Sequence, residues 1–101
     1  MDESILEDLG LSNAEIKVYL ALLEIGSSSA GPVIEKSKLQ HSVVHRALNS
    51  LINKGIINYI LEGKRKIYQA SDPENFYNFI DEKRGRFTEI LPELKKKQLS
   101  S

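Results

Sequence analysis

The chain has 101 residues, of which 41% are hydrophobic and 28% charged, as expected for one small globular domain with a single core. It has no cysteine, which excludes disulfides, thiol catalysis and cysteine-ligated zinc. No apolar run approaches the roughly 20 residues of a membrane span, and the acidic N-terminus does not resemble a signal peptide. We therefore expect a cytoplasmic protein with no membrane partner.

The formal net charge is zero, but the charges are distributed unevenly along the chain. Residues 1–35 carry seven acids against one lysine, and residues 36–66 carry seven bases against one acid. Residues 67–101 carry six charges of each sign. This distribution predicts one basic face on an otherwise acidic body, as in proteins that bind nucleic acid. Chance clustering of the charges is the alternative.

The first expected helix covers residues 13–25. Ser12 and Glu15 have the spacing of a capping box, in which the serine hydroxyl accepts from the Glu15 amide and the Glu15 side chain reaches back. Apolar residues then recur at helical spacing, and Gly26 supplies the positive φ that ends a helix. The apolar residues before Ser12 predict a further turn of helix that covers the core.

Two more helices are expected before Gly55. The second follows the N-cap candidate Ser29 and ends near Lys38. The third begins almost at once, and it covers about residues 40–53. The apolar stripe of this third helix, which we expect to face the core, consists of Val44, Ala47, Leu48 and Leu51. A connector of only a few residues between two such helices is typical of a helix-turn-helix.

After the third helix the pattern becomes strand-like. Residues 56–61 are rich in β-branched and aromatic side chains, and residues 66–70 return as a second strand after a turn at 62–64. The tip of this predicted hairpin is basic, with the sequence Lys64-Arg65-Lys66. Such a tip suits contacts to DNA phosphates, although charged residues also protect exposed strands from pairing.

A final helix is expected from Pro73 to near the C-terminus, with Asp72 as its N-cap. It has a coiled-coil-like apolar seam of about three heptads. The seam residues, which we predict to form a dimer interface, are Phe76, Ile80, Phe87, Ile90 and Leu94. Lys83 and Lys97 occupy two further positions of this seam, which is therefore imperfect.

Two interpretations of the final helix are open. Phe76, Tyr77 and Ile80 could simply cover the core of the domain, or the whole seam could pair with a second copy of the chain. Both hold if the early part packs down and the later part projects. Pro92 is expected to kink or interrupt the helix near Thr88.

Three helices followed by a basic hairpin define a winged helix-turn-helix, a mainly α fold with a small β-hairpin (α+β). In this fold the third helix fits the major groove of DNA and the hairpin, or wing, reaches the flanking backbone. We expect residues 1–71 to form this DNA-binding domain. Residues 72–101 are expected to form the coiled-coil-like dimerisation helix.

The polar face of the third helix carries the residue types that read base edges, namely arginine, asparagine, glutamine and serine. No acid occurs between Lys36 and Gly55, whereas an ordinary solvated helix would mix in glutamate. A plain polar surface is the alternative. The predicted DNA-binding residues are Gln40, His41, Ser42, His45, Arg46 and Asn49 on or beside this helix and Lys64, Arg65 and Lys66 on the wing.

Catalytic and metal-binding motifs are missing. His41 and His45 are four residues apart and resemble half of a zinc site, but no third ligand is evident. Neither the nucleophile motif Gly-x-Ser-x-Gly nor the phosphate-binding loop Gly-x-x-x-x-Gly-Lys occurs. We predict no enzyme, no metal and no cofactor.

The segment Leu9-Gly10-Leu11-Ser12, followed by residues 14–23 and 25–26, resembles the opening of the TrmB-like archaeal transcription regulators. The similarity continues through residues 44–51, 54–57, 63–70 and 72–74, so it covers residues 9 to about 80. This resemblance implies sequence-specific DNA binding by the third helix and dimerisation through the C-terminal helix.

Two departures from the family pattern matter. Many members continue into a larger sugar-binding domain, which these residues do not include, so sugar sensing is not carried over from the resemblance and the effector stays unassigned. His45 stands where the family pattern has a tyrosine, and Gln40 where it has a proline. The base preference of relatives is therefore not carried over.

We predict a sequence-specific regulator of transcription that binds double-stranded DNA as a homodimer. The alternative is a winged helix used for protein–protein assembly, in which the third helix packs on a partner. An exposed apolar patch on the third helix would favour that alternative, and only Val43 hints at one.

Overall fold

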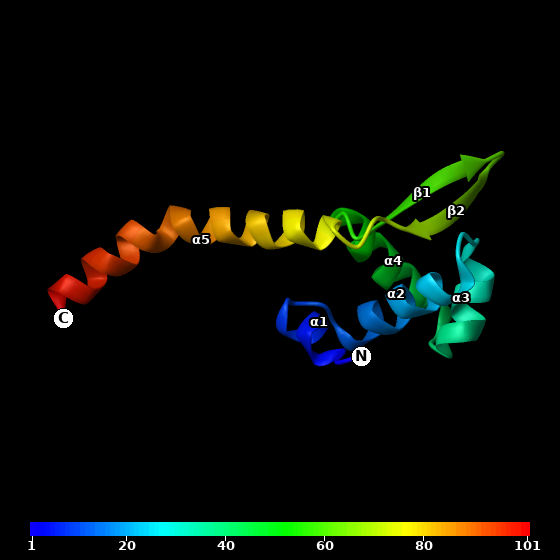
Figure 1. Ribbon diagram of the computed structural model, residues 1–101, viewed down its shortest axis with the longest axis horizontal. Helices are drawn as coiled ribbons and strands as arrows, with labels where there is room; N and C mark the ends of the chain where they lie inside the picture. Colours follow the sequence, from blue (N-terminus) through cyan, green and yellow to red (C-terminus); the bar gives the residue numbers. More distant parts are fainter.

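Five helices and one two-stranded antiparallel hairpin make up the computed structural model, which describes all 101 residues (Figure 1). The elements are α1 (Ser4–Asp8), α2 (Asn13–Ile25), α3 (Ala30–Ser37), α4 (His41–Asn53), β1 (Ile57–Glu62), β2 (Arg65–Ala70) and α5 (Asn75–Ser100). The predicted winged helix-turn-helix is confirmed. None of the helices combines the length and apolar character that crossing a membrane requires.

The N-terminus of α2 forms the capping box that the sequence predicts. The Ser12 hydroxyl accepts from the Glu15 amide at 3.1 Å, and Glu15 Oε1 accepts from the Ser12 amide at 2.9 Å. Gly26 ends the helix with φ +88°, a conformation that a side chain would strain. Ser29 lies at the N-cap position of α3, but its hydroxyl makes no capping bond there.

The core consists of fifteen buried hydrophobic residues contributed by α2, α3, α4, the hairpin and α5, together with Leu11 just before α2 and Ile56 just before β1. All four predicted inward-facing residues of α4 belong to it. The largest fully buried side chains are Leu22, Leu48, Leu51, Ile56, Ile57, Val18, Val33 and Val44. Because α2, α3 and the hairpin all pack on one side of α4, its opposite side is left for another partner.

The hairpin closes in a tighter turn than predicted. Gly63 and Lys64 alone form the turn, because Glu62 and Arg65 already pair across the strands. Gly63 adopts φ +65°, which a two-residue hairpin turn requires and glycine permits. Ser28 adds one further antiparallel bridge to Tyr68 on the outer side of β2, through hydrogen bonds of 2.7 and 2.9 Å.

The start of α5 differs from the prediction. The helix begins at Asn75, whereas Pro73 and Glu74 form a separate turn. Asp72 does cap this turn, because its Oδ1 accepts from the Glu74 amide at 2.9 Å. The backbone hydrogen bonds donated by Asn75, Phe76 and Tyr77 join residues three apart, as in a 3₁₀ turn, which is tighter than an α-helix.

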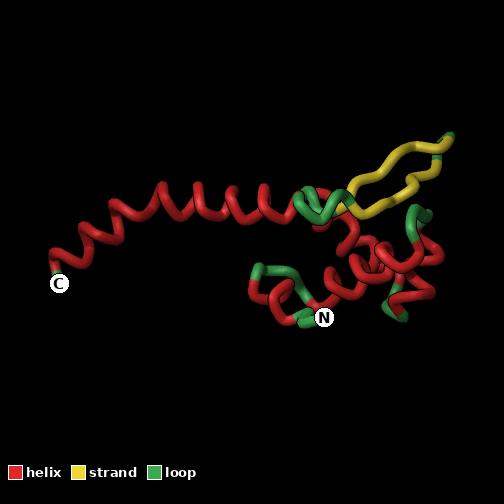
Figure 2. The backbone as a smooth tube through the Cα atoms, viewed as in Figure 1, coloured by secondary structure: helices red, strands yellow, loops and turns green.

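The first turns of α5 pack on the body and the rest projects from it (Figures 1 and 2). Phe79, which the heptad pattern left outside the seam, is 7% exposed and belongs to the core. Phe76 packs edge-on against Tyr19 with ring centroids 5.6 Å apart. The expectation that Tyr77 covers the core is wrong, because this side chain is 69% exposed.

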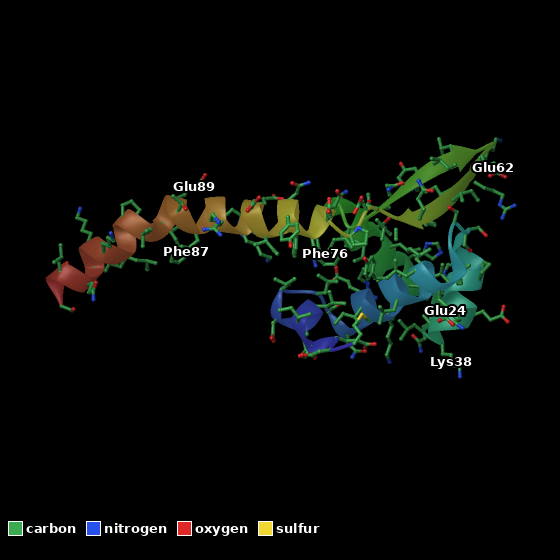
Figure 3. The ribbon with its side chains drawn as sticks, viewed as in Figure 1. Glu24, Lys38, Glu62, Phe76, Phe87 and Glu89 are labelled. Atoms are coloured by element: carbon green, nitrogen blue, oxygen red, sulfur yellow. The ribbon has the colours of Figure 1, made fainter.

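Beyond these turns, α5 gives the molecule its length of 56 Å, against 26 and 25 Å in the other directions. The radius of gyration is 16.8 Å, whereas a compact domain of this size would have about 13 Å. The helix is not interrupted at Pro92. Its axis does bend, beside Phe87 and Glu89 (Figure 3), about one turn ahead of the proline as expected.

Candidate nucleic-acid interface

The outward face of α4 is polar, and its side chains form no hydrogen bond or ion pair within the chain. Gln40 lies at the N-cap, and the helix runs from the α3 end of the body to the base of α5 (Figure 1). His45 is half-buried, whereas the other predicted base-contacting side chains are exposed, namely Gln40, His41, Ser42, Arg46 and Asn49. None of these six side chains forms an intramolecular hydrogen bond or ion pair, so their donors and acceptors are free for a ligand.

A buried carboxylate holds α4 against α2. Glu15 is only 5% exposed, although it lies in the first turn of α2. Besides the Ser12 amide, it accepts from the Ser50 hydroxyl at 2.9 Å and from Lys54 Nζ at 2.6 and 2.9 Å. One side chain therefore caps α2 and ties two positions of α4 to it.

The protonation of Glu15 reflects two opposing effects. Burial raises the pKa of its carboxyl, but the hydrogen bonds from Lys54, the Ser12 amide and Ser50 together outweigh burial. The pKa of Glu15 therefore lies below its ordinary value, and the group is charged at neutral pH. The sequence indicates the capping box, but it does not indicate the link to Lys54, which is 39 residues away.

His41 and His45 do meet on the flank of α4, as their spacing suggests. Their ring centroids are 4.3 Å apart with a tilt of 45°. No group of three or more histidine, cysteine, aspartate or glutamate side chains is arranged to hold a metal ion. The geometry is that of two adjacent aromatic rings at the start of α4.

The wing carries its cations in two different settings. Lys64 and Arg65 are exposed at the turn and make no ion pair, beside Glu62 at the tip (Figure 3). Lys66 lies over the ring of Tyr59, with Nζ 4.7 Å from the centroid. Its ammonium group is therefore oriented by the hairpin itself.

Not all of the cations in residues 36–66 are available to bind a ligand, because two of them are paired with acids. Lys54 is paired with Glu15, and Lys36 forms a 2.9 Å ion pair with Glu24. The cations of residues 36–66 that make no ion pair are Lys38, Arg46, Lys64, Arg65 and Lys66. They lie on the helix-turn-helix and the wing, the two elements that a winged helix presents to DNA.

Lys38 is a charged residue that sequence reasoning missed as a candidate. It forms the turn between α3 and α4, and it is the only non-glycine residue with positive φ, at +60°. Its side chain is exposed and extends away from the body (Figure 3). The only signal in the sequence was its place among the bases of residues 36–66.

The apolar patch that a protein-docking recognition helix would need is not present. None of the large exposed hydrophobic side chains lies on α4. Val43, the one candidate, is half-buried. The exposed surface of α4 is therefore polar, as a surface that reads base edges has to be.

Comparison with known proteins identifies the family. Residues 6–74 match the family described as sugar-specific transcriptional regulator TrmB, over more than half of the chain. The chain belongs to the TrmB family. The family is one of transcriptional regulators rather than enzymes.

Two relatives match the chain over most of its length. The uncharacterised protein MJ1082 of Methanocaldococcus jannaschii is 34% identical over 86 residues, which cover 85% of this chain and 66% of that protein. TrmBL1 of Pyrococcus furiosus, an HTH-type sugar sensing transcriptional regulator, is 35% identical over 77 residues, which cover 73% of this chain but only 22% of TrmBL1. The chain thus spans less than two thirds of these relatives.

A solved structure confirms the winged-helix fold. TrmBL2, an archaeal chromatin protein with a novel mode of DNA binding, superposes with a TM-score of 0.81 at 25% identity. The superposition covers 97% of this chain and 39% of that chain. The likeness therefore extends over the hairpin and most of α5 as well as the helix-turn-helix.

Proposed function

We propose that this TrmB-family chain recognises a specific operator as a homodimer, with α4 in the major groove and the wing on the flanking backbone. The observation that carries the proposal is the outward face of α4. It is exposed, free of internal hydrogen bonds and free of acids, although the rest of the helix is firmly packed. A rigid helix with unengaged polar groups is suited to reading base edges.

Within this face, Arg46 and Asn49 are the proposed specificity residues. An arginine donates two hydrogen bonds to the edge of guanine, and an asparagine makes a matching pair with adenine. Gln40, His41 and Ser42 lie at the N-terminal end of α4, which enters the groove first in this docking mode. His45, half-buried against His41, has the role of shaping that end of the helix.

The wing cations Lys64, Arg65 and Lys66 are the proposed phosphate contacts. Contacts of this kind position a protein on the duplex without reading its sequence. Two of the three are free in the structure, and the third is held over Tyr59. Their proposed contribution is affinity, whereas α4 supplies selectivity.

The proposed dimer interface is the seam of α5. Phe76 and Ile80 lie near the body, whereas Phe87, Ile90 and Leu94 are 52%, 48% and 45% exposed on the projecting part. Left in water, such a seam favours association, and a second copy would cover it. A dimer also doubles the number of base pairs read, which selection of one genomic site requires.

Replacing Arg46 with alanine tests the base-reading role. The parent first selects its preferred site from a library of genomic fragments, read out by sequencing. On that site Arg46→Ala should weaken binding by about 1–3 kcal/mol, with a smaller loss on random duplex. Arg84→Ala, which removes an exposed arginine from α5, serves as the matched control. Equal losses of Arg46→Ala on both duplexes would contradict the role.

A further inference from the structure

The apolar stripe on the projecting part of α5 has a definite side. Figure 3 shows Phe76 and Phe87 pointing to the same side of the helix and Glu89 to the opposite side. Ile80, Phe87 and Leu94 recur every seven residues on this side and form the first series of the seam. Positions three residues after each of them form a second, alternate series, to which Ile90 belongs. Lys83 still lies against Gly10 of the body, and beyond it Phe87, Ile90 and Leu94 are left exposed on the projecting part of α5.

Two lysines interrupt the stripe, and they discriminate between the two ways of pairing it. Lys83 and Lys97 occupy the same alternate positions as Ile90. In a parallel pair, each of these lysines would face its own copy inside the seam, with like charges in contact. In an antiparallel pair, every layer joins one residue of the seven-residue series to one of the alternate series, so no lysine faces another.

We propose that two α5 helices pair antiparallel, with Phe87 of one copy against Ile90 of the other. This inference rests on the proposed homodimer and specifies its geometry. The same register places Lys83 opposite Leu94 of the second copy and Lys97 opposite Ile80. Lys83 already directs its ammonium group toward the body, 4.7 Å from the ring centroid of Phe79, so only its aliphatic stem lines the seam.

Charges beside the seam complement each other in this register. Arg86 and Glu93 lie on the same flank of α5, are exposed and make no ion pair within the chain. In the antiparallel register, Arg86 of each copy faces Glu93 of the other. Arg86 lies just before Phe87, and Glu93 lies about one turn after its partner Ile90, so the two side chains meet beside the central layer. A parallel pair would bring neither of them to an opposite charge.

The bend of α5 also agrees with this arrangement. It occurs beside Phe87 and Glu89, at the centre of the proposed pair. Pro92 lies on the outer side, five residues after Phe87, so it removes no seam contact. The two bodies would then leave from opposite ends, with their Asn75 residues about 40 Å apart along the helices.

A charge swap tests the register in the full chain. Sedimentation equilibrium would compare the parent with Arg86→Glu, Glu93→Arg and the double variant. Each single change should raise the dimer dissociation constant on the order of tenfold, because both symmetric pairs are lost. The double variant should return to within about twofold of the parent. Arg84→Glu, a control that faces Leu91 of the second copy, should have little effect. A double variant as weak as the singles would overturn the register.

Because the chain has no cysteine, single introduced thiols give a second test. Ile80→Cys and Lys97→Cys, mixed and treated with a short thiol cross-linker, should join to each other, and neither should join to itself. Self-joining of each variant would show a parallel pair, which overturns this inference and leaves the proposed dimer intact. A parent that sediments as a monomer at tens of micromolar would overturn both.

A separate observation concerns Lys38. A lysine with φ +60° is strained relative to glycine, and at this position the side chain makes no ion pair, although Glu35 lies in the same surface hollow. The positive φ itself serves to end α3, because the Lys38 amide donates to the Ile34 carbonyl at 3.0 Å. Glycine would meet this backbone requirement without strain, and the lysine side chain makes no hydrogen bond or ion pair that would explain its presence. Lys38 lies three residues before the start of α4, at the end of the long axis that also carries the wing tip (Figure 3). We infer that Lys38 is a further phosphate contact, placed where the turn meets the DNA backbone.

This role predicts opposite effects on folding and on binding. Lys38→Gly relieves the strain, so the thermal midpoint should stay equal or rise, while affinity for duplex of any sequence falls about three- to tenfold. Lys38→Arg, which keeps the charge, should bind like the parent. Lys36→Ser is the control, because Lys36 is already paired with Glu24. Unchanged affinity in Lys38→Gly would overturn the inference.

Discussion

At the scale of single residues, Glu15 connects the stability of the domain to the placement of α4, the proposed DNA-reading helix. Its carboxylate closes the capping box of α2 and binds Ser50 and Lys54 of α4. A charge that is 5% exposed is tolerated because all its partners are hydrogen-bond donors. Removing the charge would leave the Lys54 ammonium without its partner and loosen α4 against α2.

Glu15→Gln should lower the free energy of unfolding at pH 7 by about 2–3 kcal/mol, below the loss for a fully buried pair because Lys54 partly reaches water. Urea denaturation measures the difference. Glu24→Gln, which breaks the exposed pair with Lys36, should cost less than about 1 kcal/mol. Equal losses in the two variants would show that the buried network has no special role.

The same group predicts a direction for the pH dependence. The pKa of Glu15 is lower in the folded chain than its ordinary value near 4.5. Its contribution to stability is therefore complete above pH 4.5 and is lost as the pH falls through the lower, folded-state pKa. The gap in stability between the parent and Glu15→Gln should narrow in that window. A gap that widens on acidification would contradict the assignment.

At the scale of elements, local signals predicted the helices well, and long-range contacts did not. The bounds of α2 follow from Ser12 and Glu15 at its N-terminal end and Gly26 at its C-terminal end, each of which acts on the backbone close to it in sequence. The bridge from Ser28 to Tyr68 has no local signal, because a serine has little strand preference and its partner is 40 residues away. The burial of Phe79 was missed for a related reason: a heptad pattern does not show where α5 leaves the body.

The proposed dimer interface on the projecting part of α5 can be tested with a single substitution. Phe87→Asp places a charge in the seam, so a parent that dimerises at tens of micromolar should become monomeric on sedimentation. The domain should stay folded, because Phe87 lies outside the core. Leu99→Asp is the matched control, since Leu99 is 89% exposed on the opposite side of the helix. A Phe87→Asp variant that remains dimeric would refute the seam.

At the scale of the whole molecule, the neutral net charge conceals a separation of cations from acids. The sequence predicted the separation but overstated it, because it could not show that Lys36 and Lys54 are neutralised by acids from α2. The remaining free cations lie on the helix-turn-helix and the wing. A protein with no net charge can therefore still bind a polyanion through a local field.

The salt dependence of duplex binding tests this most directly. Affinity should fall steeply with salt, because each neutralised phosphate releases counterions. Replacing Lys64, Arg65 and Lys66 with serine should weaken binding to all sequences alike and flatten the slope of log affinity against log salt by up to about 3 per domain. Replacing Lys17, Lys95 and Lys96, three cations outside the proposed interface, should leave the slope nearly unchanged. A wing variant that binds as tightly as the parent, with the same slope, would contradict the account.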